Sequence, residues 1–361
     1  MKKSIALASG AVLSCALAPA YAQSSVTLYG VIDNGFVYQS SSGNNSSAIR
    51  AVPGGLFATR YGFKGSEDIG DGLHVIFQLE QAFSGETGAA TNSADAFNRL
   101  AYVGLSGGFG QVRFGLQNTP EYDVLQAVMD PSWVKSIASP MNNFNSLIIR
   151  ASDGVAYYTP TFDGLNAKFM VALRDSSSGT GNGVGFTNVL VQYDNGPLDM
   201  AAGYERGDEP SVGAGGAYTL SGGGSAGTGA VLTVFNAGAS YGIGANRIWL
   251  AYHTENLTNT PGYLKHDVYA ISDSYQFAPT DLLSVMYGYA HDRTGSGSNA
   301  QQLGVLFEYY LSKSTELYTA AGFIQNRNKA KYTLAGTAYS GLSVAAGTDT
   351  RGIGVGLVHK F

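Results

Sequence analysis

The chain has 361 residues, with 21 Lys and Arg against 26 Asp and Glu, a formal net charge of −5 at pH 7 and a single cysteine. Charged residues make up only 13% of the chain, about half the share in a typical soluble domain. Glycine and tyrosine are abundant, with 49 and 23 residues. No basic stretch suggests a nucleic-acid-binding protein, and a disordered chain would lack so many aromatic residues.

The first 22 residues predict a secretory signal peptide. Lys2 and Lys3 precede an apolar stretch, Ile5–Ala18, and Ala20–Ala22 matches the small-residue cleavage pattern. We expect cleavage after Ala22. A lipoprotein signal at Cys15 is the alternative, although the residues before this cysteine fit that signal poorly. Because the only cysteine lies in the leader, the mature domain, residues 23–361, would contain no disulfide.

Apolar and polar residues of the mature domain alternate with the period of a β-strand. In Leu73–Glu80 the odd positions are all apolar, and the even positions include His74, Gln78 and Glu80. Alternate side chains of a strand point to opposite faces, so one face would contact lipid and the other water. No apolar run after the leader reaches the ~20 residues of a membrane helix. The pattern therefore favours a transmembrane β-barrel.

Short turns and long loops also alternate along the chain. Long segments rich in Gly, Ser and Asn include 40–52, 175–185, 207–229 and 326–349. Seven short turns lie between such segments, at 67–71, 107–110, 162–164, 195–197, 242–245, 278–281 and 312–314. Seven short turns predict about sixteen strands, and closure of the sheet satisfies every backbone N–H and C=O in lipid. The expected fold is all-β, a sixteen-stranded antiparallel transmembrane barrel.

Five segments of the chain resemble the general porins of Gram-negative bacteria, especially those of beta-proteobacteria. They are Val26–Asp33, Arg60–Asp68, Asn98–Leu105, Gly110–Gly115 and Val355–Phe361. The resemblance extends from the leader to the last residue, with the segments in the family's order. It implies a homotrimer in the cell outer membrane, whose water-filled channels pass ions and small hydrophilic solutes by passive diffusion. It also implies a third external loop folded inward.

The resemblance further implies a constriction where wall arginines face acidic residues of this loop. Arg60, Arg99 and Arg150 match the family's arginine ladder, and Arg113 is a further candidate. Strand parity agrees for Arg60, Arg99 and Arg113, which alternate with apolar neighbours, because an arginine facing lipid at the midplane would cost about 2–4 kcal/mol. The alternative is that these arginines only line the wall or hold the loop.

The third loop would run from about Asn118 to Leu147. It offers Glu121, Asp123 and Asp130 as the acidic side of the constriction. One departure from the family pattern is Leu116, which stands where many relatives carry an arginine. The sequence therefore leaves ion selectivity open, although the remaining arginines favour anions.

Two further groups of residues have simpler interpretations. Asp33 and Glu80 point inward, and we interpret them as ordinary wall residues. The last strand, with His359 and Phe361, resembles the family's recognition signal for the barrel-assembly machinery; an aromatic residue at the membrane interface is the alternative. Besides that machinery, the expected partners are outer-membrane lipid, lipopolysaccharide and the transported solutes, and not nucleic acid.

The sequence predicts neither a cofactor nor a metal site nor catalysis. No spacing of Cys and His matches a zinc site, and the adjacent pairs His266-Asp267 and His291-Asp292 point to opposite faces of a strand. Three alternatives to a general porin remain open. They are a substrate-specific outer-membrane channel, an adhesive or structural barrel, and a barrel hydrolase with His253 or His291 as base.

Overall fold

The computed structural model describes residues 25–361 except for short segments at 44–45, 146–147, 175–182, 213–217, 220–223, 226–228 and 260–263. The predicted signal peptide, residues 1–22, lies outside the described residues. Within the described residues, the chain forms twenty strands and two helices. Neither helix has the length and hydropathy of a membrane-crossing helix.

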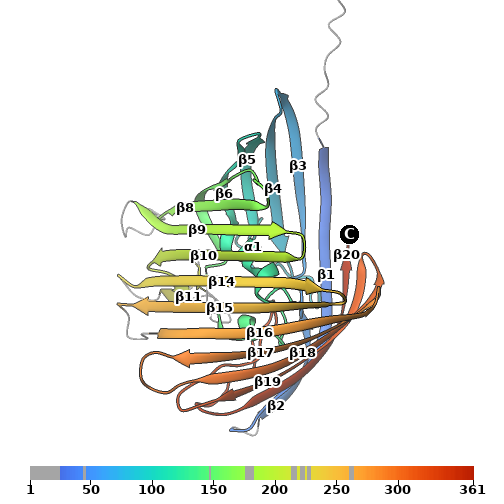
Figure 1. Ribbon diagram of the computed structural model, residues 1–361, viewed down its shortest axis with the longest axis vertical. Coiled ribbons are helices and arrows are strands. Elements are labelled where there is room, and N and C mark those ends of the chain that lie inside the picture. Colours follow the sequence, from blue (N-terminus) through green and yellow to red (C-terminus); the bar gives the residue numbers. More distant parts are fainter. Residues whose placement is uncertain are drawn as a thin grey trace, which may run out of the picture.

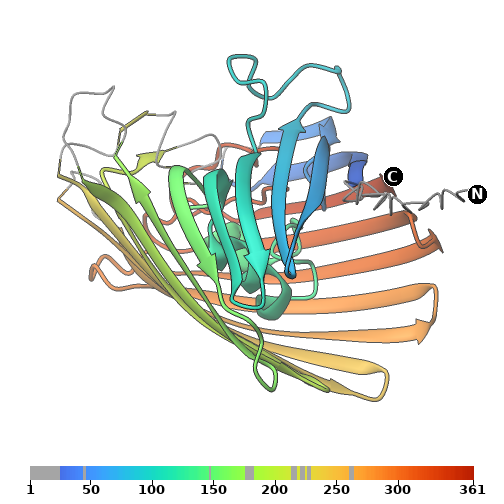
Figure 2. The same ribbon diagram turned by 90° about the horizontal axis from the view of Figure 1, so that it is seen from above.

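Sixteen antiparallel strands close into a barrel (Figure 1, Figure 2). The first strand, β1 (Ser25–Ser41), pairs with the last, β20 (Thr350–Lys360), and with β3 (Arg60–Gly70), which closes the ring. The remaining barrel strands are β4 (Leu73–Ala82), β5 (Leu100–Gly107), β6 (Gly110–Asn118), β7 (Arg150–Tyr158), β8 (Leu165–Leu173), β9 (Val184–Asn195), β10 (Leu198–Asp208), β14 (Val231–Ile243), β15 (Asn246–Thr258), β16 (Leu264–Ala278), β17 (Asp281–Asp292), β18 (Ala300–Ser312) and β19 (Thr315–Asn326). The predicted fold class is confirmed, and each predicted short turn falls at a junction between consecutive strands.

Alternation along the strands gives the barrel an apolar outer face. In β18, Leu303 and Phe307 are exposed on the outside, whereas Gln302 and Leu306 are buried on the inside. Large apolar side chains are exposed in the same way on the other strands, among them Phe63, Val103, Phe114, Val155, Phe169, Leu250, Ile271 and Val355. An exposed apolar belt of this extent is stable only in lipid.

The first hairpin differs from the expectation. Segment 40–52 was predicted to be a long external loop, but β1 continues to Ser41 and returns as β2 (Ser46–Pro53), which pairs with the second half of β1. The chain then leaves the sheet at residues 54–59 and re-enters it as β3 on the first half of β1. Polar composition predicted a loop here because an outer hairpin in water needs no apolar face. Short strands β11 (Ser211–Val212), β12 (Tyr218–Thr219) and β13 (Gly224–Ser225) form a separate small sheet.

Asp33 holds residues 54–59, which leave the sheet between β2 and β3, in place. Its buried carboxylate accepts the backbone N–H groups of Leu56 and Phe57, each at 2.7 Å, and the hydroxyl of Tyr318 at 2.9 Å. Three donors on one carboxylate satisfy backbone groups that the interrupted sheet leaves without a ladder partner. Asp33 is therefore a structural anchor and not an ordinary wall residue.

The third loop folds into the barrel, as Figure 1 shows for α1. Two short helices form within it, α1 (Pro120–Met129) and α2 (Pro140–Phe144). Each begins with proline at the first helical position, after a capping hydroxyl: Thr119 accepts from the N–H of Tyr122 at 3.2 Å, and Ser139 from that of Asn142 at 2.9 Å. The loop contacts β9, β10, β14 and β15 through α1, and β16–β18 through α2.

Glycines on the inner wall allow this loop to lie against the strands. A Cβ atom at Gly304 of β18 would lie 1.8 Å from the carbonyl oxygen of Ala138, and one at Gly322 of β19 would lie 2.5 Å from that of Ile137. Gln302 Nε2 donates to the same Ile137 carbonyl at 2.9 Å. The wall and the loop backbone are therefore in direct contact.

A second loop also folds inward. Residues 326–349 were predicted to form an external loop, yet Leu334 within them is fully buried. The backbone of Ala335 exchanges hydrogen bonds with the third loop, accepting from Asn142 at 2.7 Å and donating to Asn143 at 2.9 Å. Thr337 donates to the carbonyl of Lys135 at 2.8 Å. Gly- and Ser-rich composition concealed this packing because a few apolar side chains are enough to anchor the loop.

Candidate functional site

The four predicted arginines lie on neighbouring strands of one side of the barrel. Arg60 begins β3, Arg99 directly precedes β5, Arg113 lies within β6 and Arg150 begins β7. The side chains of Arg60 and Arg99 are close enough to interact electrostatically, as are those of Arg99 and Arg150. The structure thus brings together a band of cations on the inner wall.

Glu80 of β4 holds two of these arginines. Its Oε2 lies 3.1 Å from Arg60 Nε, and its Oε1 lies 2.5 Å from Arg99 Nε. Tyr29 donates its hydroxyl to the same carboxylate at 2.9 Å. The sequence interpretation of Glu80 as an ordinary wall residue was wrong, because strand parity gives the face of a residue but not its partners across strands.

The other two arginines lie over aromatic rings. The Arg113 guanidinium is 5.1 Å from the ring centroid of Tyr102 and 4.2 Å from that of Tyr158. Lys168 of β8 is 5.5 Å from the Tyr158 ring, and Arg150 is 5.9 Å from the ring of Tyr122. Among the described residues, none of these three cations has a carboxylate within 4.0 Å. Sequence analysis missed Lys168, although its inward parity between Ala167 and Phe169 was a usable signal.

Asp123 is the predicted loop carboxylate that faces the cations. It lies on α1, is exposed to the lumen and accepts from Asn118 Nδ2 at 2.7 Å. Arg113, Lys168 and Arg150 all act electrostatically on its carboxylate. Asp123 is therefore a predicted acidic residue that the structure places near the cations of the wall.

Glu121 points the other way. Residues two positions apart on a helix do not share a face, so Glu121 is buried against the wall, where Asn188 and Asn236 donate to it at 2.9 and 2.6 Å. Burial raises the pKa of Glu121 to about 8. The structure does not bring Glu121 to the arginines.

Asp130 is also away from the arginine band. It is buried within its own loop, where it accepts from the backbone and hydroxyl of Ser132 at 2.8 and 2.7 Å and from the N–H of Val134 at 3.1 Å. The Ser139 hydroxyl donates to its second oxygen. Burial raises the pKa of Asp130. Strand parity cannot place a loop residue, and here the carboxylate satisfies local donors instead of facing the lumen.

Replacing Asp130 with alanine is expected to loosen the third loop. Two backbone N–H groups and two hydroxyls lose their acceptor, and each buried unsatisfied donor costs about 1–3 kcal/mol. The loop would fluctuate from the wall, and single-channel recordings should show a larger and noisier conductance than wild type. Asp95→Ala, in an exposed loop, is the control. An unchanged, quiet conductance in Asp130→Ala would contradict this role.

The loop carries a cation that the sequence did not reveal. Lys135 Nζ is 5.1 Å from the ring centroid of Phe57 and 5.3 Å from that of Trp133. Burial, together with the positive charges of Arg60 and Arg99, lowers the pKa of Lys135 to about 8. The loop therefore adds positive charge near Arg60 and Arg99.

Positive charge predominates among the described groups of the region formed by the arginine band and the adjoining third loop. Its six cations, Arg60, Arg99, Arg113, Arg150, Lys168 and Lys135, are opposed by the carboxylates of Glu80 and Asp123. A hollow of about 670 Å³ adjoins this band and is lined by Arg113, Lys168, Gln111, Tyr158 and His74. A narrow passage with this charge excess lowers the energy of anions relative to cations.

The C-terminal residue takes part in closure of the barrel. Phe361 and Gly30 exchange two backbone hydrogen bonds, at 2.9 and 3.0 Å. A Cβ at Gly30 would lie 2.3 Å from the Phe361 ring, so the glycine makes room for it. His359 contacts the Thr315 hydroxyl at 2.9 Å, and both His359 and Phe361 are exposed. These residues lie at the seam between the first and last strands.

Comparison with known proteins gives a consistent set of relatives. A family model described as Gram-negative porin matches residues 6–329. Outer membrane porin protein 32 of Delftia acidovorans is 31% identical over the whole of both chains, and a major outer membrane protein P.IB of Neisseria meningitidis serogroup B is 28% identical over the same extent. The solved anion-selective porin from Comamonas acidovorans has 28% identity and a TM-score of 0.78, covering 94% of this chain and all of its own.

Proposed function

Because the chain belongs to the Gram-negative porin family, we propose that it passes small hydrophilic anions in preference to cations. It is an outer-membrane porin, a channel of the cell outer membrane. The main support for an anion preference is the excess of cations over carboxylates at the proposed constriction. The similar porin from Comamonas acidovorans is described as anion-selective, which supports the proposal.

The proposed mechanism is passive diffusion through a transverse electric field. Arg113, Arg150 and Lys168 face the lumen from the wall, and Asp123 faces them from the loop. A hydrated anion crosses the narrow region by exchanging part of its water for these cations, and the field orients dipolar solutes. Transport of this kind requires neither turnover nor a bound cofactor, and catalysis is no part of the proposed function.

Export, assembly and oligomeric state complete the proposal. Residues 1–22 serve as a cleaved signal peptide, and the last strand, with His359 and Phe361, is the segment that the barrel-assembly machinery recognises. The mature barrel is a homotrimer surrounded by outer-membrane lipid and lipopolysaccharide. A solved outer membrane protein of Vibrio cholerae, OmpT, is described in a trimer form, with 17% identity and a TM-score of 0.66 to this chain.

The reversal potential of refolded channels in a salt gradient across a planar bilayer tests the proposal. We expect insertion events in three equal conductance steps and a shift toward the chloride equilibrium potential. A shift toward the potassium potential would overturn the anion preference while leaving the pore. Absence of any current from correctly folded protein would overturn the diffusion channel itself.

Anion preference is expected to fall as the pH rises past 8. Since the pKa of Lys135 is lowered to about 8, its ammonium is charged below that pH and neutral above it, whereas an ordinary lysine would stay charged to about pH 10. Reversal potentials between pH 7 and 9.5 measure this change. Lys135→Gln should already have the lower preference at pH 7 and show no further fall. A wild-type preference that is constant across this range would contradict the assignment.

A further inference from the structure

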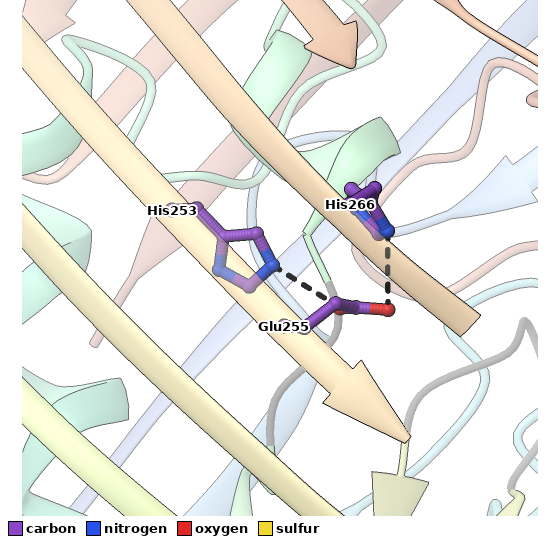
Figure 3. Close-up of side chains that lie close together, drawn as sticks. All are labelled: His253, Glu255 and His266. Carbon is purple, nitrogen blue, oxygen red and sulfur yellow. Dashed lines mark hydrogen bonds and ion pairs between the residues drawn. The ribbon is translucent and has the colours of Figure 1, made fainter. Parts of the chain in front are cut away.

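Three buried side chains meet on the inner wall away from the arginine band. His253 and Glu255 lie two positions apart on β15, and His266 on β16 is the direct cross-strand partner of Glu255. All three therefore project from the same face of a hairpin, and all three are buried. Figure 3 shows the two imidazole rings on either side of the carboxylate.

The distances from Glu255 to the two histidines are close to those between ligand atoms of one metal ion. His253 Nε2 lies 3.1 Å from Glu255 Oε2, and His266 Nδ1 lies 3.4 Å from Glu255 Oε1. One ligand atom from each residue can be chosen so that all lie within 4.8 Å of one another. Tetrahedral zinc has bonds of about 2.0–2.2 Å, which place neighbouring ligand atoms roughly 3.3–3.6 Å apart.

Outside hydrogen bonds determine which nitrogen of each histidine carries the proton. The amide nitrogen of Asn236 donates to Glu121, so its oxygen faces His253 Nδ1, at 2.8 Å, and must accept from it. His266 Nε2 lies 2.8 Å from the carbonyl oxygen of Phe144 and must donate to it. In the neutral rings, the free lone pairs are therefore on His253 Nε2 and His266 Nδ1, which both face Glu255.

Two lone pairs pointing at a carboxylate repel it unless a cation lies between them. His266 Nδ1 is buried and has no hydrogen-bond partner among the described residues. Metal-binding histidines commonly donate their second N–H to a carbonyl or carboxylate, as both rings do here. We propose that His253 Nε2, His266 Nδ1 and a Glu255 oxygen bind a divalent first-row transition-metal ion, for which Zn²⁺ is the probe.

Such an ion would link the barrel wall to the third loop. His266 donates to Phe144, the last residue of α2, and His253 is connected through Asn236 to Glu121 at the start of α1. Metal binding would thus immobilise both helices of the loop through outer-shell hydrogen bonds. The site shares no residue with the anion passage, whose wall cations lie on or next to β3 and β5–β8.

Zinc titration of the refolded, tag-free barrel in detergent tests the inference. After EDTA treatment, we expect one Zn²⁺ per chain, measured by competition with a chromophoric chelator, and a Tm about 5 °C higher at roughly a hundredfold excess over Kd. His266→Gln and Glu255→Gln should weaken binding by more than about 100-fold, whereas His291→Gln, an exposed histidine on β17, should leave it unchanged.

Wild-type protein alone can overturn the inference if a variant misfolds. X-ray absorption of the zinc-loaded barrel should show two imidazole nitrogens and carboxylate oxygen in the first shell. Absence of 1:1 zinc binding, a shell without two imidazoles, or full binding by folded His253→Gln and His266→Gln would each refute the site. If zinc does not bind, a proton between Glu255 and the histidine nitrogens takes the place of the metal ion.

Discussion

Replacement of Arg113, Arg150 and Lys168 together with glutamine is expected to abolish most of the anion preference. At about 9 Å in water each charge contributes about 0.5 kcal/mol to the energy of a passing ion, and salt roughly halves this value. Because each charge acts with opposite sign on anions and cations, three charges change their relative energy by about 1.4 kcal/mol. The chloride-to-potassium permeability ratio should therefore fall about tenfold.

Arg113, Arg150 and Lys168 can be replaced without breaking an ion pair among the described residues. They have no carboxylate in ion-pair contact among the described residues and lie over aromatic rings, so their removal leaves no buried carboxylate without its partner. The control is replacement of three exposed lysines outside the constriction by glutamine: Lys313, Lys329 and Lys331. If the permeability ratio changed equally in both triple variants, net charge and not the constriction would control selectivity.

Replacement of Glu80 with alanine is expected to be the most destabilising single change at the constriction. It leaves Arg60 and Arg99 facing each other without the carboxylate that contacts both at 3.1 and 2.5 Å. Removal of one partner from a buried ion pair costs about 3–5 kcal/mol, and partial exposure of the arginines favours the lower end. The midpoint of unfolding in detergent should fall accordingly, while the surviving channels become more anion-selective.

A neutral triple variant separates charge from packing. If Glu80, Arg60 and Arg99 all become glutamine, no charge remains uncompensated, and most of the stability lost in Glu80→Ala should return. Glu67→Ala, at an exposed position of β3, should unfold like wild type. Equal unfolding midpoints for Glu80→Ala and Glu67→Ala would disprove that Glu80 stabilises the barrel by holding Arg60 and Arg99 together.

The sequence predicted the barrel because the relevant information is local. Each strand has its own period-2 pattern, and each short turn has its own Gly, Asn or Pro, so strand number and facing follow without tertiary knowledge. Inward parity likewise predicted the faces of Arg60, Arg99 and Arg113. Residues whose position depends only on their own strand were therefore predictable.

Features that depend on contacts between distant segments could not be predicted from the sequence. Glu121 and Asp123 differ in facing because a helix forms between two strands, and the sequence analysis assigned no helix there. Lys135 lies beside the ring of Phe57, a residue of a distant segment of the chain. The His253, Glu255 and His266 cluster was missed because only chain neighbours were considered as chelating pairs, although a hairpin pairs Glu255 with His266.

The glycine-lined contact between the third loop and the far wall has a consequence for the order of folding. Ile137 and Gln302, which share a hydrogen bond across this contact, are 165 positions apart in the chain. The surface that receives the loop is built from β17–β19, so it exists only once the C-terminal strands have paired. Such non-local contacts form late. The third loop therefore reaches its final position, and the channel its final bore, only after β17–β19 have formed.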